Sequence, residues 1–240
     1  MVFRTSASAI ALWNLCPARA VAKYVWGYEE PENEAMREGT RLHRIVQKYM
    51  HGAEVPPANE KAARKCIEVL PVGPGSIYRA DIERVVLLDE HTGFLDWMRG
   101  TRKHGDLKFT KSVRYQKEKN PETDPQRILY ALDAFEMDPS RVDTLKQSWT
   151  VTEFSGAKAL TLVHTWTHVT ARKQYEKVVR PVHDALATAV AKSTHWQDAP
   201  KNLESCDMYP PDGCIMKKHG CRRSLRDRLI AITPKAKKKT

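Results

Sequence analysis

Long apolar runs are missing from this 240-residue sequence, and no stretch approaches the ~20 residues that a membrane-spanning helix needs. The N-terminal stretch has a short apolar segment, but polar residues interrupt it and Cys16-Pro17 follows. We therefore interpret it as an internal structural segment and not as an export signal, which predicts a cytoplasmic protein without a membrane partner. The sequence also has no internal repeats and no G-x-x-x-x-G-K-[ST] phosphate loop, so it carries no helicase motor built on that loop.

Cysteine is scarce, with five residues in the chain: Cys16, Cys66, Cys206, Cys214 and Cys221. An odd number of cysteines without an export signal argues against a disulfide framework. Cys66 lies in a predicted helix, where we expect it to be a core residue. Three of the others gather near the C-terminal end, a pattern that favours metal or iron–sulfur ligation.

Positive charge is abundant, with a net charge of +11 and an isoelectric point near 9.4. That balance favours a polyanionic partner, and nucleic acid before a membrane surface. Basic residues are especially dense at the end of the chain, where residues 233–240 are predicted to form a disordered basic tail. The apolar content of 41% is ordinary for a globular protein.

Periodicity predicts an α/β fold with a mixed central sheet flanked by helices, in one domain over residues 1–232. Residues 1–76 form its helical part, 77–169 its sheet core, and 170–232 a C-terminal helix and cysteine cluster. The predicted helices are Ser6–Tyr28 (broken at Pro17), Glu34–Met50, Asn59–Leu70, Pro125–Glu136 (capped by Asp124) and Thr170–Lys192. The predicted strands are Ile77–Leu88, Gly93–Met98, Gly105–Phe109, Val142–Thr152 and Ala159–Val169, with a basic loop over Thr110–Asp124 and a turn at Ser155-Gly156.

Two carboxylates and a lysine form the pattern with the most chemical content, within Thr92–Thr110. Residues two apart in a strand point to the same face, so Asp106 and Lys108 project together if Gly105–Phe109 is a strand. Asp96 joins them if its own strand is the hairpin neighbour. Such a group suits a hard divalent cation beside a phosphate, with the lysine orienting water or neutralising charge. The same triplet also occurs on ordinary solvated strand faces.

Three more polar side chains lie on predicted helices. His43 follows Gly39 by one turn, and Gln126 precedes Tyr130 by one turn. Glycine costs about 1 kcal/mol relative to alanine inside a helix, which favours a close approach of another group at Gly39. Each side chain also has a structural explanation, since a histidine on an apolar face and a tyrosine in an amphipathic helix are usually core residues. A glutamine in a first helical turn is usually exposed.

In sequence order, the motifs Gly39-x-x-x-His43, Gly93-x-x-Asp96, Asp106-x-Lys108 and Gln126-x-x-x-Tyr130 resemble those of the PD-(D/E)XK nucleases, in particular the RecB-like branch. That branch includes nuclease domains of the AddB type, CRISPR-adaptation nucleases and phage exonucleases. The resemblance implies a restriction-endonuclease-like core and a Mg²⁺- or Mn²⁺-dependent deoxyribonuclease. It implies metal ligation by His43, Asp96, Asp106 and the backbone carbonyl of Leu107, with Lys108 as the catalytic lysine.

The same resemblance implies that Gln126 and Tyr130 contact the DNA strand or support the active site. The substrate would be single-stranded DNA or duplex ends, in a prokaryotic or phage-infected cell. Lys111 and Arg114, in the basic stretch after Lys108, are expected near the phosphates. The partner would be a helicase, or a recombination or integration protein. The alternative functions are a DNA-end-trimming nuclease of the CRISPR-adaptation type and a catalytically weak DNA-binding subunit that works beside a helicase. Tyr115 and Trp97 can stack on bases, although core packing is the favoured reading of Trp97.

Iron–sulfur members of this family hold a [4Fe–4S] cluster with one cysteine before the nuclease core and three after it. Cys16, Cys206, Cys214 and Cys221 match that order and number, and four thiolates are what such a cluster requires. In the family the first two of the three later cysteines are generally closer together than here. A Cys₄ zinc site is the alternative, with His219 able to replace one ligand, and a metal-free set of cysteines is a third reading.

Overall fold

The computed structural model describes residues 4–29, 32–77, 82–88, 90–100, 102–137, 143–202, 216 and 221. The chain divides into two compact units, the first formed by Met1–Ser8 with Pro31–Pro181 and the second by Ala9–Glu30 with Val182–Thr240. The single-domain organisation expected from the sequence stays a prediction. In the described part of the chain, no helix is long and apolar enough to cross a membrane.

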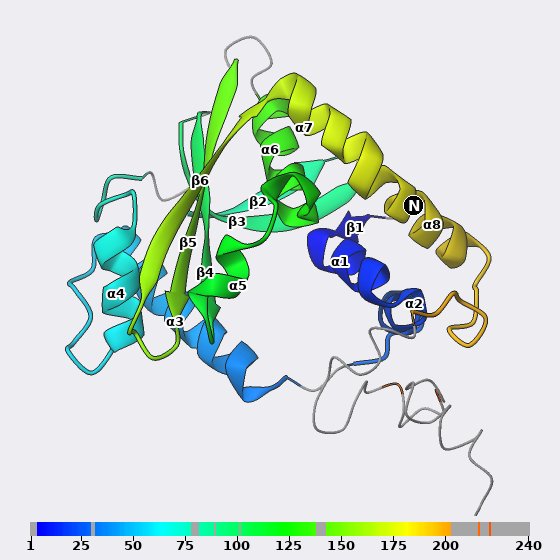
Figure 1. Ribbon diagram of the computed structural model, residues 1–240, viewed down its shortest axis with the longest axis horizontal. Coiled ribbons are helices and arrows are strands. Elements are labelled where there is room, and N and C mark those ends of the chain that lie inside the picture. The colour runs from blue at the N-terminus through cyan, green and yellow to red at the C-terminus, as the bar shows by residue number, and fades with distance from the viewer. Residues whose placement is uncertain are drawn as a thin grey trace, which may run out of the picture. The chain divides into compact units, whose positions relative to one another are not determined.

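The first unit is a mixed α/β structure built on a six-stranded sheet within the described residues (Figure 1). Its strands are β1 (Thr5–Ser6), β2 (Ile82–Leu88), β3 (His91–Arg99), β4 (Lys103–Thr110), β5 (Thr144–Glu153) and β6 (Ala159–Thr167). The order is β1-β3-β4-β5-β6, with β2 paired to β3. β1 is parallel to β3 and β4 is parallel to β5, whereas the other pairings are antiparallel. The predicted mixed sheet is therefore confirmed, as is the hairpin of β3 and β4.

Helices pack on this sheet at several places, and their local sequences explain where they begin. The helices of the unit are α3 (Glu34–Met50), α4 (Lys61–Val69), α5 (Val113–Lys117), α6 (Pro125–Met137) and α7 (His168–Gln174). Asn33 caps α3 by accepting a hydrogen bond of 2.9 Å from the Met36 N–H. Asp124 caps α6 by accepting from the Gln126 N–H at 3.0 Å, and Pro125 occupies the first position. Both helix starts agree with the sequence prediction.

The ladder between β3 and β4 is short, and this feature positions the site. Only three residue pairs are in register: Trp97 with Gly105, Met98 with His104, and Arg99 with Lys103. Beyond Gly105, β4 continues to pair with β5 over its full length but no longer pairs with β3. The two strands thus separate on the side where Asp96 and Asp106 lie. A backbone edge left open inside a sheet needs other hydrogen-bond partners.

An apolar core lies where α3 and α4 meet the sheet. Its buried members include Leu42, Val46, Met50, Cys66, Trp97 and Leu107. Trp97 is 1% exposed, so the favoured reading of this side chain as a core residue is confirmed, and so is the prediction for Cys66. Trp97 covers Gly105 so closely that a Cβ atom there would lie 2.6 Å from the indole nitrogen and closer still to two ring carbons.

The second unit contains most of α1 (Ala7–Leu15), α2 (Pro17–Tyr24) and most of α8 (Arg180–Ala191). The predicted break at Pro17 is confirmed: Cys16 has an extended backbone between α1 and α2, and Pro17 begins the second helix. The core of this unit includes Cys16, Val21, Ala189, Trp196 and Met216, with Cys221 packed against it.

Several sequence predictions need correction. The stretch Thr110–Asp124 is not only loop, because it contains α5 and the 3-10 turn η2 (Pro121–Thr123). Buried Val113 anchors α5, and Arg114 pairs with Glu118 one turn later. The predicted helix Thr170–Lys192 begins earlier, at a capping box of Thr167 and Thr170, and includes the π-helical segment η3 (Tyr175–Val179).

The other corrections concern one glycine and one strand. A Cβ atom at Gly39 would meet nothing within 4 Å, so the close approach expected there does not occur within the described chain. Of the predicted strand Ile77–Leu88, the structure shows β2 from Ile82, and residues 78–81 lie outside the described part. The predicted tail, residues 233–240, also lies outside it.

The contrast between two glycines gives a first prediction. Gly105→Ala should destabilise the protein by about 1–3 kcal/mol, because the new methyl group is forced into the Trp97 ring in a filled core. Gly39→Ala should instead stabilise it by up to about 1 kcal/mol, since alanine favours the helix and has space. Urea unfolding of both variants beside wild type measures the two effects, and equal midpoints would contradict the packing described here.

Candidate functional site

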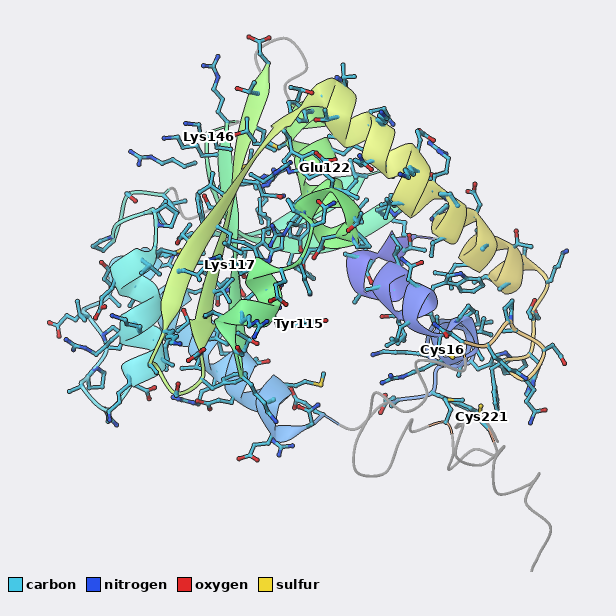
Figure 2. The ribbon with its side chains drawn as sticks, viewed as in Figure 1. Cys16, Tyr115, Lys117, Glu122, Lys146 and Cys221 are labelled. Atoms are coloured by element: carbon cyan, nitrogen blue, oxygen red, sulfur yellow. The ribbon has the colours of Figure 1, made fainter. Side chains whose placement is uncertain are left out.

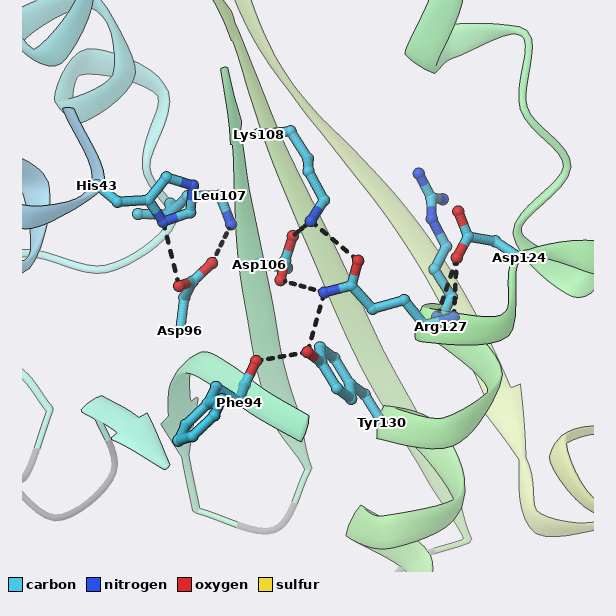
Figure 3. Close-up of polar contacts among 10 residues, drawn as sticks. His43, Phe94, Asp96, Asp106, Leu107, Lys108, Asp124, Arg127 and Tyr130 are labelled. Carbon is cyan, nitrogen blue, oxygen red and sulfur yellow. Dashed lines mark hydrogen bonds and ion pairs between the residues drawn. The ribbon is translucent and has the colours of Figure 1, made fainter. Parts of the chain in front are cut away.

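Side chains from four elements converge where β3 and β4 separate (Figure 3). β3 supplies Asp96, and β4 supplies Asp106 and Lys108, which project to the same face as their spacing of two requires. α3 supplies His43, and α6 supplies Gln126 and Tyr130. The structure thus brings the two carboxylates and the lysine to one opening, and the roles expected of them stay predictions.

Asp96 fills the opening between the two strands. Its Oδ2 accepts a hydrogen bond of 2.6 Å from the Leu107 N–H of β4, and its Oδ1 lies 3.3 Å from His43 Nδ1. Burial by itself raises the pKa of Asp96, but the hydrogen bond and charge of His43, the Leu107 N–H and the charge of Lys108 together hold it below its ordinary value. The carboxylate thus replaces a missing ladder bond while remaining ionised.

Gln126 connects Asp106, Lys108 and Tyr130. Its amide nitrogen donates to Asp106 Oδ1 at 3.0 Å and to the Tyr130 hydroxyl at 2.9 Å, and its carbonyl oxygen accepts from Lys108 Nζ at 2.9 Å. The Tyr130 hydroxyl in turn donates to the backbone carbonyl of Phe94 on the open edge of β3. Of the two roles expected for Gln126 and Tyr130, the contacts in the chain itself match support of the site.

Burial and the neighbouring charge of Asp96 disfavour the ionised form of Asp106, which a bound cation would stabilise. It is 2% exposed, and its Oδ2 lies 2.6 Å from Lys108 Nζ. Burial raises its pKa to about 7, with the charge of Asp96 adding to the rise and Lys108 opposing it. Two buried carboxylates with a histidine beside them are a donor set that suits Mg²⁺ or Mn²⁺.

The donor atoms do not form a preorganised metal-binding site. Among the residues that the structure describes, no group of three or more His, Cys, Asp or Glu side chains is placed to hold a metal ion. The reason lies in the contacts above, because Asp96 is engaged by Leu107 and His43, and Asp106 by Lys108 and Gln126. The residues fit such an ion in chemistry, and Lys108 and Gln126 hold the carboxylate that would ligate it.

A cleft of about 840 Å³ reaches His43, Asp96 and Lys108, whereas Asp106 is not among the described residues that line it. It is lined in part by Gly39, His43, Asp96 and Lys108, and the basic side chains of Arg44 and Lys111 also face it. Gly39 therefore leaves open space in the cleft, and no other part of the described chain packs closely against it. A second hollow of about 970 Å³ shares Asn33, Ala35, Lys111 and Phe154 with the first.

Not every predicted residue lies at this cleft. Arg114 projects from α5 with its side chain 85% exposed and paired to Glu118, and it is not among the described residues that line either hollow. Cys16 and Cys221 belong to the second unit, whereas Cys206 and Cys214 lie outside the described residues. The predicted four-cysteine site therefore remains a prediction.

Two residues near the site were missed by sequence reasoning. The β2–β3 register pairs Ile82 with Trp97 and Arg84 with Leu95, which places Glu83 opposite Asp96. Glu83 lines the cleft and has a φ of 54°, a backbone conformation uncommon for a residue other than glycine. The second is Arg127, which follows Gln126 and is buried. Neither a lone glutamate in a strand nor an arginine in a helix gives a signal in the sequence.

Comparison with known proteins finds a sequence profile and a solved structure to which the chain is similar. Residues 4–100 match the sequence profile of the PD-(D/E)XK nuclease superfamily, a span that includes His43 and Asp96 and ends before Asp106. The structure is similar to that of an alkaline exonuclease from Laribacter hongkongensis, with a TM-score of 0.41 and 12% identity over 79% of this chain and 93% of that chain. No curated protein sequence matches the chain.

The open strand edge generates a second prediction. Tyr130→Phe should destabilise the protein by about 1–2 kcal/mol, because it leaves the Phe94 carbonyl and one Gln126 N–H without their partner. Tyr115→Phe is the matched control, since that hydroxyl is on a ring 63% exposed, and its effect should stay within about 0.5 kcal/mol. Thermal and urea unfolding of both variants compare them, and equal losses would show that the hydroxyl does not close the edge.

Proposed function

We propose that this protein is a metal-dependent DNA nuclease of the RecB-like PD-(D/E)XK type, with a restriction-endonuclease-like core. It would hydrolyse phosphodiester bonds in single-stranded DNA or at duplex ends. The observation that carries the proposal is the convergence of His43, Asp96, Asp106 and Lys108 at one opening in the sheet. The profile match over residues 4–100 supports the same class.

The donor set supports a divalent cation as part of this proposal. His43, Asp96, Asp106 and the backbone carbonyl of Leu107 would hold it, as oxygen-rich ligation with one histidine suits Mn²⁺ and Mg²⁺. When bound, such an ion polarises a phosphoryl oxygen and lowers the pKa of a coordinated water. Gln126 fixes the orientation of the Asp106 carboxylate by donating a hydrogen bond of 3.0 Å to its Oδ1.

Lys108 is suited to hold a substrate oxygen or a water molecule. An ammonium group has three N–H donors, and here two contacts are made, to Asp106 Oδ2 at 2.6 Å and to Gln126 Oε1 at 2.9 Å. Because Lys108 also lines the cleft, its remaining donor can face the substrate. Its charge would stabilise the negative charge that develops on the phosphate during hydrolysis.

The surroundings of the cleft suit a DNA backbone. Arg44 and Lys111 line it beside Lys108, and the chain carries a net charge of +11. Neutralising phosphates with such side chains supplies most of the affinity for DNA in the absence of base readout. This basic cleft is the reason to assign DNA, and not a small phosphate ester, as the substrate.

A cleavage assay tests this function. Wild-type protein should degrade end-labelled single-stranded or duplex DNA with Mg²⁺ or Mn²⁺ and not with chelator. Asp106→Ala should lower the rate by at least about a hundredfold, because a group that stabilises charge in the transition state is worth that much or more. Asp184→Ala, on the exposed side of α8, is the matched control and should retain the wild-type rate.

The outcome of that assay also separates the alternatives. Degradation that survives Asp106→Ala would disprove the assigned site. DNA binding without cleavage by wild-type protein would instead favour a binding subunit that works beside a helicase. Cleavage that appears only with added integration or recombination proteins would favour an end-trimming nuclease of the adaptation type.

We also propose that Cys16, Cys206, Cys214 and Cys221 hold a [4Fe–4S] cluster, with zinc as the alternative metal. Cys16 and Cys221, far apart in sequence, belong to the same apolar cluster of the second unit (Figure 2). The Cys16 thiol is buried and free of disulfide bonds. Four cysteine thiolates would complete the ligand set for either metal.

Metal analysis of cysteine variants tests this site. Protein purified without oxygen should contain iron and sulfide and absorb visible light, and Cys16→Ala should lose both signals. Cys66→Ala is the control, because that buried thiol packs in the core of the first unit and should leave the metal content unchanged. If wild-type protein contains one zinc per chain and no iron, the site is a zinc site and not a cluster. If neither wild-type protein nor Cys66→Ala contains metal, the proposed metal site is wrong.

A further inference from the structure

Arg127 is a buried cation that the contacts of the active site do not use. It lies in the first turn of α6 and is 3% exposed. Its Nε and Nη2 atoms are enclosed without a hydrogen-bond partner within the described chain, so Nη1 is the guanidinium nitrogen that is not enclosed in this way. Burying an unpaired charge costs several kcal/mol unless a partner offsets it. The side chain therefore calls for an anion.

Neither neighbouring carboxylate supplies that anion directly. Asp106 is paired with Lys108 at 2.6 Å. Asp124 accepts the backbone N–H groups of Gln126 and Arg127 at 3.0 and 3.3 Å, and Figure 3 draws no bond from its carboxylate to the guanidinium. The guanidinium lies 4.4 Å from the ring centre of Trp149, a contact that offsets only part of the burial cost.

Lys119 is a second cation near Arg127, because the charge of Arg127 acts on it and the charge of Asp124 acts on both. Its Nζ lies 4.9 Å from the ring centre of Tyr115, which is one of the exposed large side chains of the unit. Burial lowers the pKa of Lys119, Asp124 opposes that effect, and the charges of Lys108 and Arg127 lower it further. The charges of Lys108 and Arg127 thus both act on Lys119, and no ion pair within the described residues engages Arg127 or Lys119.

We propose that Arg127 and Lys119 form a subsite for a backbone phosphate of the DNA strand, next to the phosphate held for cleavage at Lys108. The inference rests on the proposed nuclease function and adds to it the position of one neighbouring nucleotide. Arg127 would present Nη1 from the floor of the subsite and Lys119 would close it from the more exposed side. Tyr115, which Figure 2 shows on α5, would stack on a base of the same strand.

The chemistry favours a phosphate over other anions. The Arg127 guanidinium on the Trp149 face keeps its charge, and its Nη1 can donate charge-assisted hydrogen bonds to a phosphate oxygen. Lys108 Nζ and the Arg127 guanidinium lie 5.6 and 4.4 Å from the centre of the same Trp149 ring. A strand that brings one phosphate to Lys108 therefore brings a neighbouring phosphate toward Arg127. An isolated phosphate would lack the contacts that the rest of the strand provides.

A phosphate-by-phosphate binding experiment tests the subsite. The full chain is titrated, with Ca²⁺ replacing Mg²⁺, against fluorescent hairpins that end in a short single strand. Each hairpin carries one neutral methylphosphonate at a different position. For wild-type protein, one position should weaken binding about tenfold, as expected for loss of one charge-assisted contact. Arg127→Met should weaken binding to unmodified DNA by a similar factor and should abolish the penalty at that one position.

Arg172→Met is the matched control. Arg172 also lies over an aromatic ring, 5.8 Å from the centre of Tyr175, but it is paired with Glu136 at 3.0 Å. Its loss should leave the penalty at every position unchanged. The salt dependence gives a second reading, since losing one phosphate contact should reduce the slope of log affinity against log salt by about 0.7 for a single strand. That reduction should appear for Arg127→Met and not for Arg172→Met.

The possible results each decide the inference. If Arg127→Met keeps the same positional penalty as wild type, the side chain does not contact phosphate and the inference is wrong. If that variant does not fold, Arg127→Lys decides, because it keeps the charge and should retain part of the positional penalty. Cleavage by wild type without any positional coupling overturns the subsite alone. Positional coupling without cleavage supports the subsite and overturns the nuclease function.

Discussion

The site depends on one substitution of hydrogen bonds, in which the Asp96 side chain takes the place of a backbone partner for the Leu107 N–H. β3 and β4 pair through only three residues and then part. Without a replacement, the open edge would leave buried backbone groups unsatisfied, at a cost of about 1–3 kcal/mol each. The 2.6 Å bond to Asp96 and the bond from the Tyr130 hydroxyl to Phe94 close that edge with side chains. The same two bonds hold a carboxylate and a tyrosine at the opening, so the separation of the strands and the placement of these side chains depend on the same contacts.

Electrostatics explains why the opening needs support from both faces of the sheet. His43 reaches Asp96 from α3, whereas Gln126 reaches Asp106 and Lys108 from α6. Asp106 is buried enough for its pKa to rise to about 7, whereas Asp96 is held below its ordinary pKa by its own partners. Two adjacent carboxylates therefore differ in how readily they ionise. A cation between them would favour the ionised form of both, which is the physical reason to place a metal here.

Much of this arrangement follows from local rules that a sequence displays. The spacing of two between Asp106 and Lys108 fixes their common face once β4 is a strand, and the cap at Asp124 fixes the start of α6 and hence the turn that carries Gln126. Long-range features are less accessible. The β3–β4 ladder ends at the close pair of Trp97 and Gly105, which no local pattern predicts, and the left-handed backbone at Glu83 leaves no mark on the sequence. The π-helical segment that buries Tyr175 against His91 likewise arises from tertiary contacts.

Arg127 shows how a departure from a local rule can carry information. A fully buried arginine in the first turn of a helix is unfavourable both for its desolvation and for the positive end of the helix dipole. Trp149 and Asp124 reduce that cost but do not provide a paired anion. Asp106 and Lys108 nearly neutralise one another, and the single charge of Asp124 offsets only one of the two cations Arg127 and Lys119, which leaves an excess positive charge. A stable fold gains nothing from that excess, whereas a strand of phosphates entering beside Lys108 would balance it. The charge that destabilises the protein alone is thus the charge that would bind its substrate.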